Sequence, residues 1–318
     1  MSASRKVKLI RISPKTLLVG DKYEYTIYQH QEGDVYKKFL PLKKEYNYEA
    51  FKYIEKNNIN NLYVTHQDFK KYIKKGSEYL CEYIKSDDIN LLVKSEFMYQ
   101  LSCEMMYDLL SETITKEKID ELSKNIDVAI QLIYAEPEGI KTLIQVTTHD
   151  YETHTHSVDV ATYALGFGHY LGLNKDQLKQ LTLGAILHDL GKKNIPSEIV
   201  NKKGIYSDQE FRIMKNHPSY GVDTLRKIGI EDESILAIVE EHHEKVDGSG
   251  YPRGLTGDKI HIFAQIVSIC DIFNALTTRR SYKEQKASFE ALKLMHSKMK
   301  YELNPKLFSK FIAFMGER

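Results

Sequence analysis

The most constraining feature of this chain is the uneven distribution of its histidines. Nine of the twelve lie between His149 and His261. The densest stretch is HHEKVDGSGYP, residues 242–252, which places two adjacent imidazoles and the carboxylates Glu244 and Asp247 before a turn rich in glycine. Imidazole and carboxylate together suit a hydrolytic first-row metal ion. The string alone would also fit a solvated helix end, but the other histidines favour a metal site in this half.

Composition narrows the remaining classes. A length of 318 residues allows two domains and a sizeable core. The net charge of +1 gives no overall attraction to DNA or to a membrane. Three widely spaced cysteines do not suggest a disulfide framework, and no apolar run approaches the roughly 20 residues that span a bilayer. These features predict a soluble cytoplasmic protein.

Hydrophobic patterning predicts an α+β chain in three segments. Residues 1–66 are expected to form a small mixed α/β regulatory or interaction domain, 67–147 a helical connector, and 148–318 an all-α helical bundle. Expected strands in the first segment are Val7–Ile12, Lys22–Tyr28, Val35–Leu40 and Asn61–Val64, with a helix over Tyr48–Glu55.

The connector carries an apolar stripe from Ile119 to Ile133 at helical spacing. The stripe fits an intramolecular core face better than a partner helix or a second protomer. The string Glu136–Gly139 is expected to break this helix, and Ser207–Glu210 forms a capping box that opens a later one.

Candidate metal ligands recur through the last segment. His188 and Asp189 end an apolar helix, and His217 stands before a proline. Asp271 interrupts the apolar run IVSIC, and a carboxylate in such surroundings is costly unless a cation compensates it. A helix cap or salt bridge remains the alternative for Asp271. Two neighbouring metal ions would suit phosphodiester hydrolysis, and donor types without cysteine fit Fe, Mn or Zn.

The His188–Asp189 pair, followed downstream by HHExxDGxGYP, resembles the HD-GYP family of bacterial cyclic-di-GMP phosphodiesterases, a branch of the HD metallohydrolases. The resemblance covers residues 148–315. It implies two or three iron ions per chain, with manganese as an alternative, and Glu152 would serve a third metal. The implied metal ligands are Glu152, His156, His188, Asp189, His217, His242, His243 and Asp271.

The resemblance also implies roles around the metals. His188, Asp189 and Lys192 would be catalytic. Substrate contacts would come from Lys192, Tyr251, Asn274, Arg280 and Lys283. The GYP loop would be built by Asp247, Gly248, Gly250, Tyr251 and Pro252.

Three positions depart from the family pattern. Asn274 replaces a usual aspartate, Asp159 stands where arginine or asparagine is more common, and Ser281 replaces a usual proline. None of them removes an expected metal ligand, but each could change how a substrate fits.

The expected reaction is hydrolysis of cyclic-di-GMP to pGpG, with GMP as a further product. Hydrolysis of another cyclic dinucleotide, such as 3′,3′-cGAMP, and a non-catalytic cyclic-di-GMP sensor are the alternatives. The resemblance also implies contacts between the GYP loop and diguanylate cyclase domains, and a homodimer remains open. Neither DNA nor a membrane is an expected partner.

Overall fold

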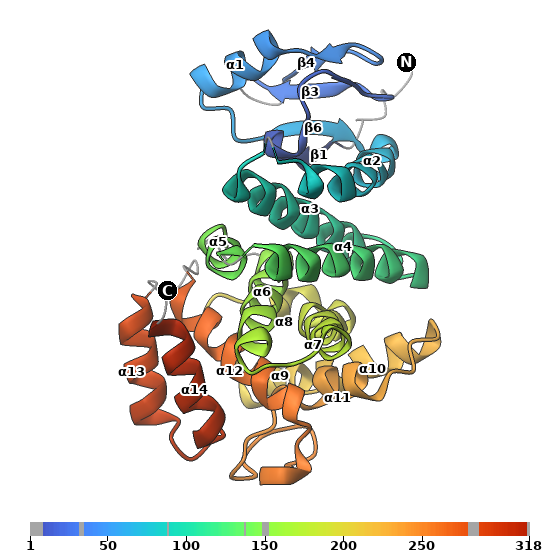
Figure 1. The fold of residues 1–318 in the computed structure, drawn as a ribbon. Coiled ribbons are helices and arrows are strands. Elements are labelled where there is room, and N and C mark those ends of the chain that lie inside the picture. Colours follow the sequence, from blue (N-terminus) through green and yellow to red (C-terminus); the bar gives the residue numbers. More distant parts are fainter. Residues whose placement is uncertain are drawn as a thin grey trace, which may run out of the picture. The chain divides into compact units, whose positions relative to one another are not determined.

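The computed structural model describes residues 9–31, 35–87, 89–136, 138–147, 153–278 and 286–316. The chain divides into two compact units, Met1–Met105 and Met106–Arg318 (Figure 1). The boundary between them falls inside helix α3 (Leu91–Ser111). The finer division into segments 1–66, 67–147 and 148–318 stays a prediction.

The first unit is built on an antiparallel sheet with the strand order β1-β6-β3-β4. Ile10, Ile12, Leu62 and Val64 alternate along β1 and β6 and are buried, and α2 packs against both strands. A second pair, β2 and β5, forms a separate ribbon. The elements of this unit besides α3 are β1 (Leu9–Ile12), η1 (Pro14–Thr16), β2 (Asp21–Lys22), β3 (Ile27–His30), β4 (Tyr36–Leu40), β5 (Glu45–Tyr46), α1 (Tyr48–Lys56), β6 (Leu62–Thr65) and α2 (His66–Lys85).

The single strand expected over Lys22–Tyr28 is wrong. Its alternation is real, because Tyr23, Tyr25 and Ile27 are all buried. However, β2 pairs with β5, whereas β3 pairs with β4 and β6, so the chain passes from one sheet to the other between Lys22 and Ile27. Alternating burial therefore occurs here without a continuous ladder of hydrogen bonds.

The second unit is helical. The stripe of α4 is buried and α4 packs against α7, which confirms the intramolecular interpretation. The helix ends at Ala135 and the next begins at Gly139. The elements are α4 (Lys116–Ala135), α5 (Gly139–Gln145), α6 (Thr153–Tyr170), α7 (Lys175–Leu187), η2 (Leu190–Asn194), α8 (Ser197–Val200), α9 (Asp208–Met214), α10 (His217–Lys227), α11 (Glu233–Glu241), η3 (Gly257–Lys259), α12 (Ile262–Thr277), α13 (Ser288–Lys298) and α14 (Pro305–Gly316).

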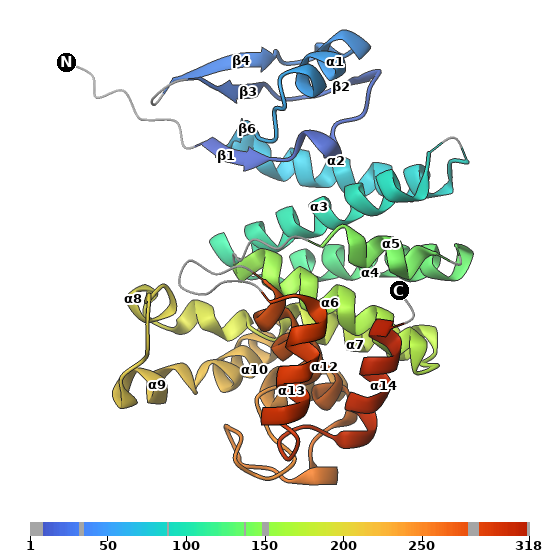
Figure 2. The ribbon, with the colours of Figure 1, turned by 90° about the vertical axis from the view of Figure 1, so that its left-hand side faces the viewer.

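Helices α6, α7, α11 and α12 form the centre of this unit, with α13 and α14 on its outer side (Figure 2). Helix α6 is buried around most of its circumference. Ser207 and Glu210 form the expected capping box at the start of α9. The chain is therefore α+β, with the sheet confined to the first unit. None of the helices described combines the length and apolar character needed to cross a membrane.

Candidate metal centre

Two candidate ligands lie where α7 ends. The helix stops at Leu187, and His188 and Asp189 follow it, both almost completely buried. The Nδ1 atom of His188 lies 2.6 Å from the carbonyl oxygen of Ala185. A carbonyl can only accept, so this bond assigns the proton to Nδ1 and leaves a lone pair on Nε2.

A glycine brings the next ligand to Asp189. A Cβ atom at Gly191 would lie 1.9 Å from the carbonyl oxygen of His217, so only glycine lets η2 approach α10 this closely. His217 is the first residue of α10, and its Nδ1 lies 2.8 Å from the carbonyl oxygen of Met214. Its Nε2 lies 3.3 Å from Oδ1 of Asp189.

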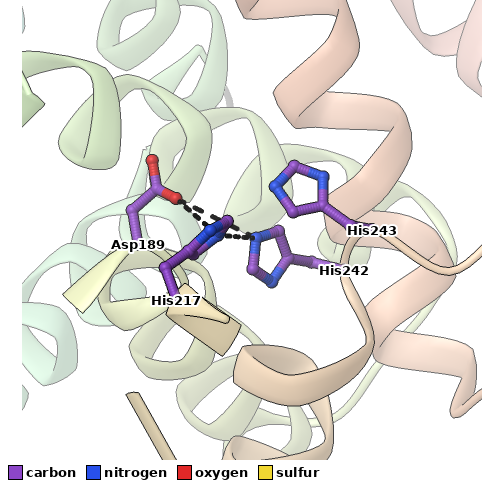
Figure 3. A group of neighbouring side chains, drawn as sticks. All are labelled: Asp189, His217, His242 and His243. Atoms are coloured by element: carbon purple, nitrogen blue, oxygen red, sulfur yellow. Dashed lines mark hydrogen bonds and ion pairs between the residues drawn. The ribbon is translucent and has the colours of Figure 1, made fainter. Parts of the chain in front are cut away.

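The adjacent histidines follow α11. Nδ1 of His242 lies 3.0 Å from the carbonyl oxygen of Val239, and its Nε2 lies 3.9 Å from Oδ1 of Asp189. The ring of His243 lies beside that of His242, with centroids 4.1 Å apart. Asp189, His217, His242 and His243 thus form one group whose donor atoms all lie within 4.8 Å of one another (Figure 3).

A second group shares Asp189. His156 of α6, His188 and Asp189 also place one donor atom each within 4.8 Å of the others. Nε2 of His156 lies 3.1 Å from Oδ1 of Asp271 on α12 and 3.8 Å from Oδ2 of Asp189. Each carboxylate oxygen of Asp189 therefore faces a different group, which is the arrangement that a carboxylate bridging two metal ions requires.

The donor set fits metal ions. Nε2 of His188 and Oδ1 of Asp189 are buried and have no hydrogen-bond partner among the described residues, although an orphaned buried polar atom is costly. Burial, reinforced by the neighbouring His217, lowers the pKa of His243 to about 3, and burial lowers the pKa of His242 as well. Both imidazoles are neutral at pH 7, so protons do not compete for their lone pairs.

The acidic members are ionised in spite of their burial. Burial alone would raise the pKa of Asp189, but Lys192 and His188 hold it well below its usual range. The Lys192 ammonium lies 2.5 Å from Oδ2 of Asp189. Burial likewise opposes ionisation of Asp271, and the bond to His156 keeps the pKa of this carboxyl low. The carboxylates can therefore hold cations.

The loop after His243 covers one side of the first group. The ring of Tyr251 stacks on that of His243, with centroids 4.7 Å apart. A Cβ atom at Gly250 would lie 2.4 Å from the backbone nitrogen of Lys245, so the loop can fold back here only with glycine. Asp247 accepts hydrogen bonds from the backbone nitrogen and hydroxyl of Ser249, as a loop-building residue should.

Sequence reasoning missed two carboxylates that hold this loop. Glu244 is buried and accepts hydrogen bonds from the backbone nitrogens of Arg253 at 2.6 Å and Leu255 at 2.9 Å. Glu241 pairs with the guanidinium of Arg253 and accepts a bond from the backbone nitrogen of His261 at 2.6 Å. Glu244 thus supports the loop, although its place in the motif pointed to metal chemistry.

An aromatic and cationic surface beside Tyr251 was also missed. Phe211 of α9 contacts Tyr251 edge to face, with centroids 6.2 Å apart. The ammonium of Lys215 lies 4.6 Å from the ring centre of Phe211 and 5.5 Å from that of Tyr251. The spacing of four residues between Phe211 and Lys215, in a helix that leads directly to His217, was the available signal.

The structure brings seven of the eight expected metal ligands together around Asp189. Glu152, Arg280, Lys283 and Ser281 lie outside the described residues. Asn274, expected at the substrate, is buried and directs its side chain to His156 and Asp159. His154 packs against Tyr107, with ring centroids 5.6 Å apart.

The sequence matches the family model described as HD domain over residues 127–307. It is 29% identical over 198 residues to a cyclic di-GMP phosphodiesterase of Pseudomonas aeruginosa, covering 62% of this chain and 46% of that protein. It is 36% identical over 166 residues to 3′3′-cGAMP-specific phosphodiesterase 2 of Vibrio cholerae, covering 51% of this chain and 31% of that protein. It is also 35% identical over 172 residues to a cyclic di-GMP phosphodiesterase of Thermotoga maritima, covering 53% of this chain and 46% of that protein.

The chain thus spans less than half the length of these curated relatives. A solved structure of an HDG"Y"P protein from Bdellovibrio bacteriovorus shares the fold, with a TM-score of 0.74 over 97% of this chain and 100% of that chain, at 17% identity. The family model, the relatives and the shared fold agree with the ligand-bearing helices described above. The chain therefore belongs to the HD domain family and, within it, to the HD-GYP branch.

Proposed function

We propose that this chain hydrolyses cyclic di-GMP to pGpG, with GMP as the product of a second cleavage. The observation that carries the proposal is the pair of buried donor groups that share the carboxylate of Asp189. The relatives of Pseudomonas aeruginosa and Thermotoga maritima support the substrate, since both are cyclic di-GMP phosphodiesterases. Metal ions bound there would activate water and polarise the phosphoryl group.

The protein's own residues orient this chemistry. Backbone carbonyls fix the rings of His188, His217 and His242, so their Nε2 atoms are in place before any metal arrives. Asp189 supplies one oxygen to each group, and Asp271 adds a carboxylate beside His156. Because the donor set is fixed in advance, little reorganisation accompanies metal binding.

Lys192 is the proposed proton donor. Its ammonium lies 2.5 Å from Oδ2 of Asp189, so it is held at the point where the two groups meet. From there it can stabilise charge on the phosphoryl oxygens or protonate the leaving oxygen. We also propose that Tyr251, Phe211 and Lys215 contact the dinucleotide. The two aromatic rings can stack on its bases, and the ammonium of Lys215 attracts its phosphates.

The remaining roles follow the resemblance. We propose iron, in two or three ions per chain, with manganese as the alternative and Glu152 as a ligand of the third ion. Arg280 and Lys283 are proposed phosphate contacts, for which Arg in particular has suitable geometry. The Asp247–Pro252 loop is the proposed contact for diguanylate cyclase domains. A cytoplasmic location and a homodimer complete the proposal.

A second candidate substrate is 3′,3′-cGAMP. The observation favouring it is the 36% identity to the cGAMP-specific enzyme of Vibrio cholerae. The two dinucleotides differ in one base, so the discriminating contacts are those to the bases and not those to the phosphates. Assays with the two substrates in parallel distinguish the candidates.

The test uses the full chain purified without oxygen, with bound metals counted and both dinucleotides followed by chromatography. We expect two or three irons per chain and formation of pGpG. Asp189→Asn should abolish turnover, whereas Asp127→Asn, which alters a half-exposed acid paired with Lys179, should not. A folded, metal-loaded protein that leaves both dinucleotides intact would reject the enzyme and favour the sensor.

A further inference from the structure

Two buried polar residues, Asp159 and Asn274, lie next to His156. They are 0% and 2% exposed. Asp159 lies three residues after His156 on α6, and Asn274 lies three residues after Asp271 on α12. Residues three apart share a helix face, so the two pairs occupy successive turns of the contact between α6 and α12.

The hydrogen bonds of this pair have a single consistent direction. Oδ1 of Asn274 lies 2.7 Å from Nδ1 of His156, and Nδ2 of Asn274 lies 3.3 Å from Oδ2 of Asp159. A carboxylate only accepts, so the amide must turn its NH2 group to Asp159 and its oxygen to His156. That oxygen also only accepts, so Nδ1 of His156 must carry the proton. Nε2, which lies 3.1 Å from Oδ1 of Asp271, is then the ring nitrogen left to face a metal ion.

His156 needs such help because of its position. His188 and His242 cap the ends of α7 and α11, and His217 begins α10. Near a helix end, a backbone carbonyl is available to fix the ring. His156 lies in the first turn of α6, where the free backbone groups are N–H groups and the carbonyls already take part in the bonds of the helix itself. A side chain, Asn274, faces its Nδ1 instead, and an amide that can flip needs an orienting group of its own.

We propose that Asp159 and Asn274 are positioning residues that hold His156 as the Nδ1–H tautomer and so reserve its Nε2 for a metal ion. Asp159 fixes the amide of Asn274, and the amide fixes the imidazole. This inference rests on the metal-binding part of the proposed function and not on the identity of the substrate.

The decisive variants exchange the two side chains. Asp159→Asn keeps the shape but lets the Asn274 amide flip, so that its NH2 group can face Nδ1 and drive the proton to Nε2. We expect the dissociation constant of Mn²⁺ at this group to rise 10- to 100-fold, the range found for partners of ligating histidines. The double variant Asp159→Asn/Asn274→Asp restores the direction of the bonds, because the new carboxylate accepts from both neighbours. It should bind Mn²⁺ within about threefold of the parent chain, a smaller change than the loss in the single variant.

Two readouts on the full chain test the proposal without substrate. Binding of Mn²⁺ alone is titrated by the electron paramagnetic resonance signal of the free ion, and the presence of a proton on Nδ1 of His156 is read from long-range ¹H–¹⁵N spectra of the metal-free protein. Thr182→Val is the control, since it removes a buried hydroxyl bond on α7 at 2.6 Å without touching His156. It should lower stability and leave both readouts unchanged.

The outcomes separate this inference from the proposed function. Weaker binding in Asp159→Asn with recovery in the double variant supports the positioning roles. A parent-like tautomer and affinity in Asp159→Asn would overturn them, and so would a double variant as weak as the single one. If the parent chain binds Mn²⁺ but cleaves no dinucleotide, the proposed function fails while this inference stands.

Discussion

Replacing Gly191 by alanine should push apart the two backbone segments that carry Asp189 and His217. The new Cβ atom would lie 1.9 Å from the carbonyl oxygen of His217 and 2.5 Å from the backbone nitrogen of Gly221. Ordinary contact begins near 3.4 Å, so η2 and α10 must move apart by about 1.5 Å. Both neighbours are backbone atoms, and a rotamer change cannot relieve the overlap.

The movement separates two ligands of one group. Nε2 of His217 and Oδ1 of Asp189 are 3.3 Å apart, and metal–ligand distances tolerate only about 0.2 Å of error. We therefore expect Gly191→Ala to weaken metal binding by the group of Asp189, His217, His242 and His243 more than by the group that includes His156. Overpacking of this kind also costs about 1–3 kcal/mol of unfolding free energy.

The assay compares Gly191→Ala with Gly316→Ala, whose new Cβ atom would meet nothing within 4 Å. Metals per chain are counted after dialysis, and thermal unfolding is followed with and without added Mn²⁺. The increase in melting temperature that Mn²⁺ confers should be smaller in Gly191→Ala, because a ligand that binds the folded state stabilises it more when its affinity is higher. Equal metal content and equal melting temperatures in the two variants would refute the reasoning.

Three further outcomes are expected. Asp189→Asn should weaken both metal groups, whereas His243→Gln should weaken one, and titration of the metal-free proteins with Mn²⁺ distinguishes these results. Lys192→Met should lower kcat by about 10²–10⁴, the usual contribution of a general acid, when assayed with metal in excess; a normal kcat would exclude it as proton donor. Burial raises the pKa of Glu104 to about 8, so the first unit should lose a few kcal/mol of stability as pH rises from about 4.5 through 8, at about 1.4 kcal/mol per pKa unit. Glu104→Gln should flatten that dependence in thermal unfolding at pH 5–9, and an unchanged slope would contradict the assignment.

Most helices, and the residue types of the candidate ligands, could be predicted from local patterns in the chain. Helix periodicity placed the stripe of α4 on a core face, and the break after Ala135 followed from a run containing proline and glycine. The carboxylate of Asp271 amid apolar residues indicated a compensating cation, and the structure places it 3.1 Å from His156. The stripe and the helix break were confirmed because burial of apolar side chains and helix termination act locally and leave a pattern along the chain, whereas the cation at Asp271 stays a prediction.

Which side chains meet across the fold could not be predicted in this way. Asp159 and Asn274 read as two unrelated departures from the family pattern, yet they are bonded to each other 115 residues apart. Glu244 stands in the histidine-rich motif without a predicted role, and its partners are backbone nitrogens nine and eleven residues later. The passage of the chain between two sheets at Tyr23–Tyr25 was likewise invisible, because burial alternates there as it would in one strand. A hydrogen bond depends on the positions of both partners, and the second partner is fixed only when distant helices and strands pack together.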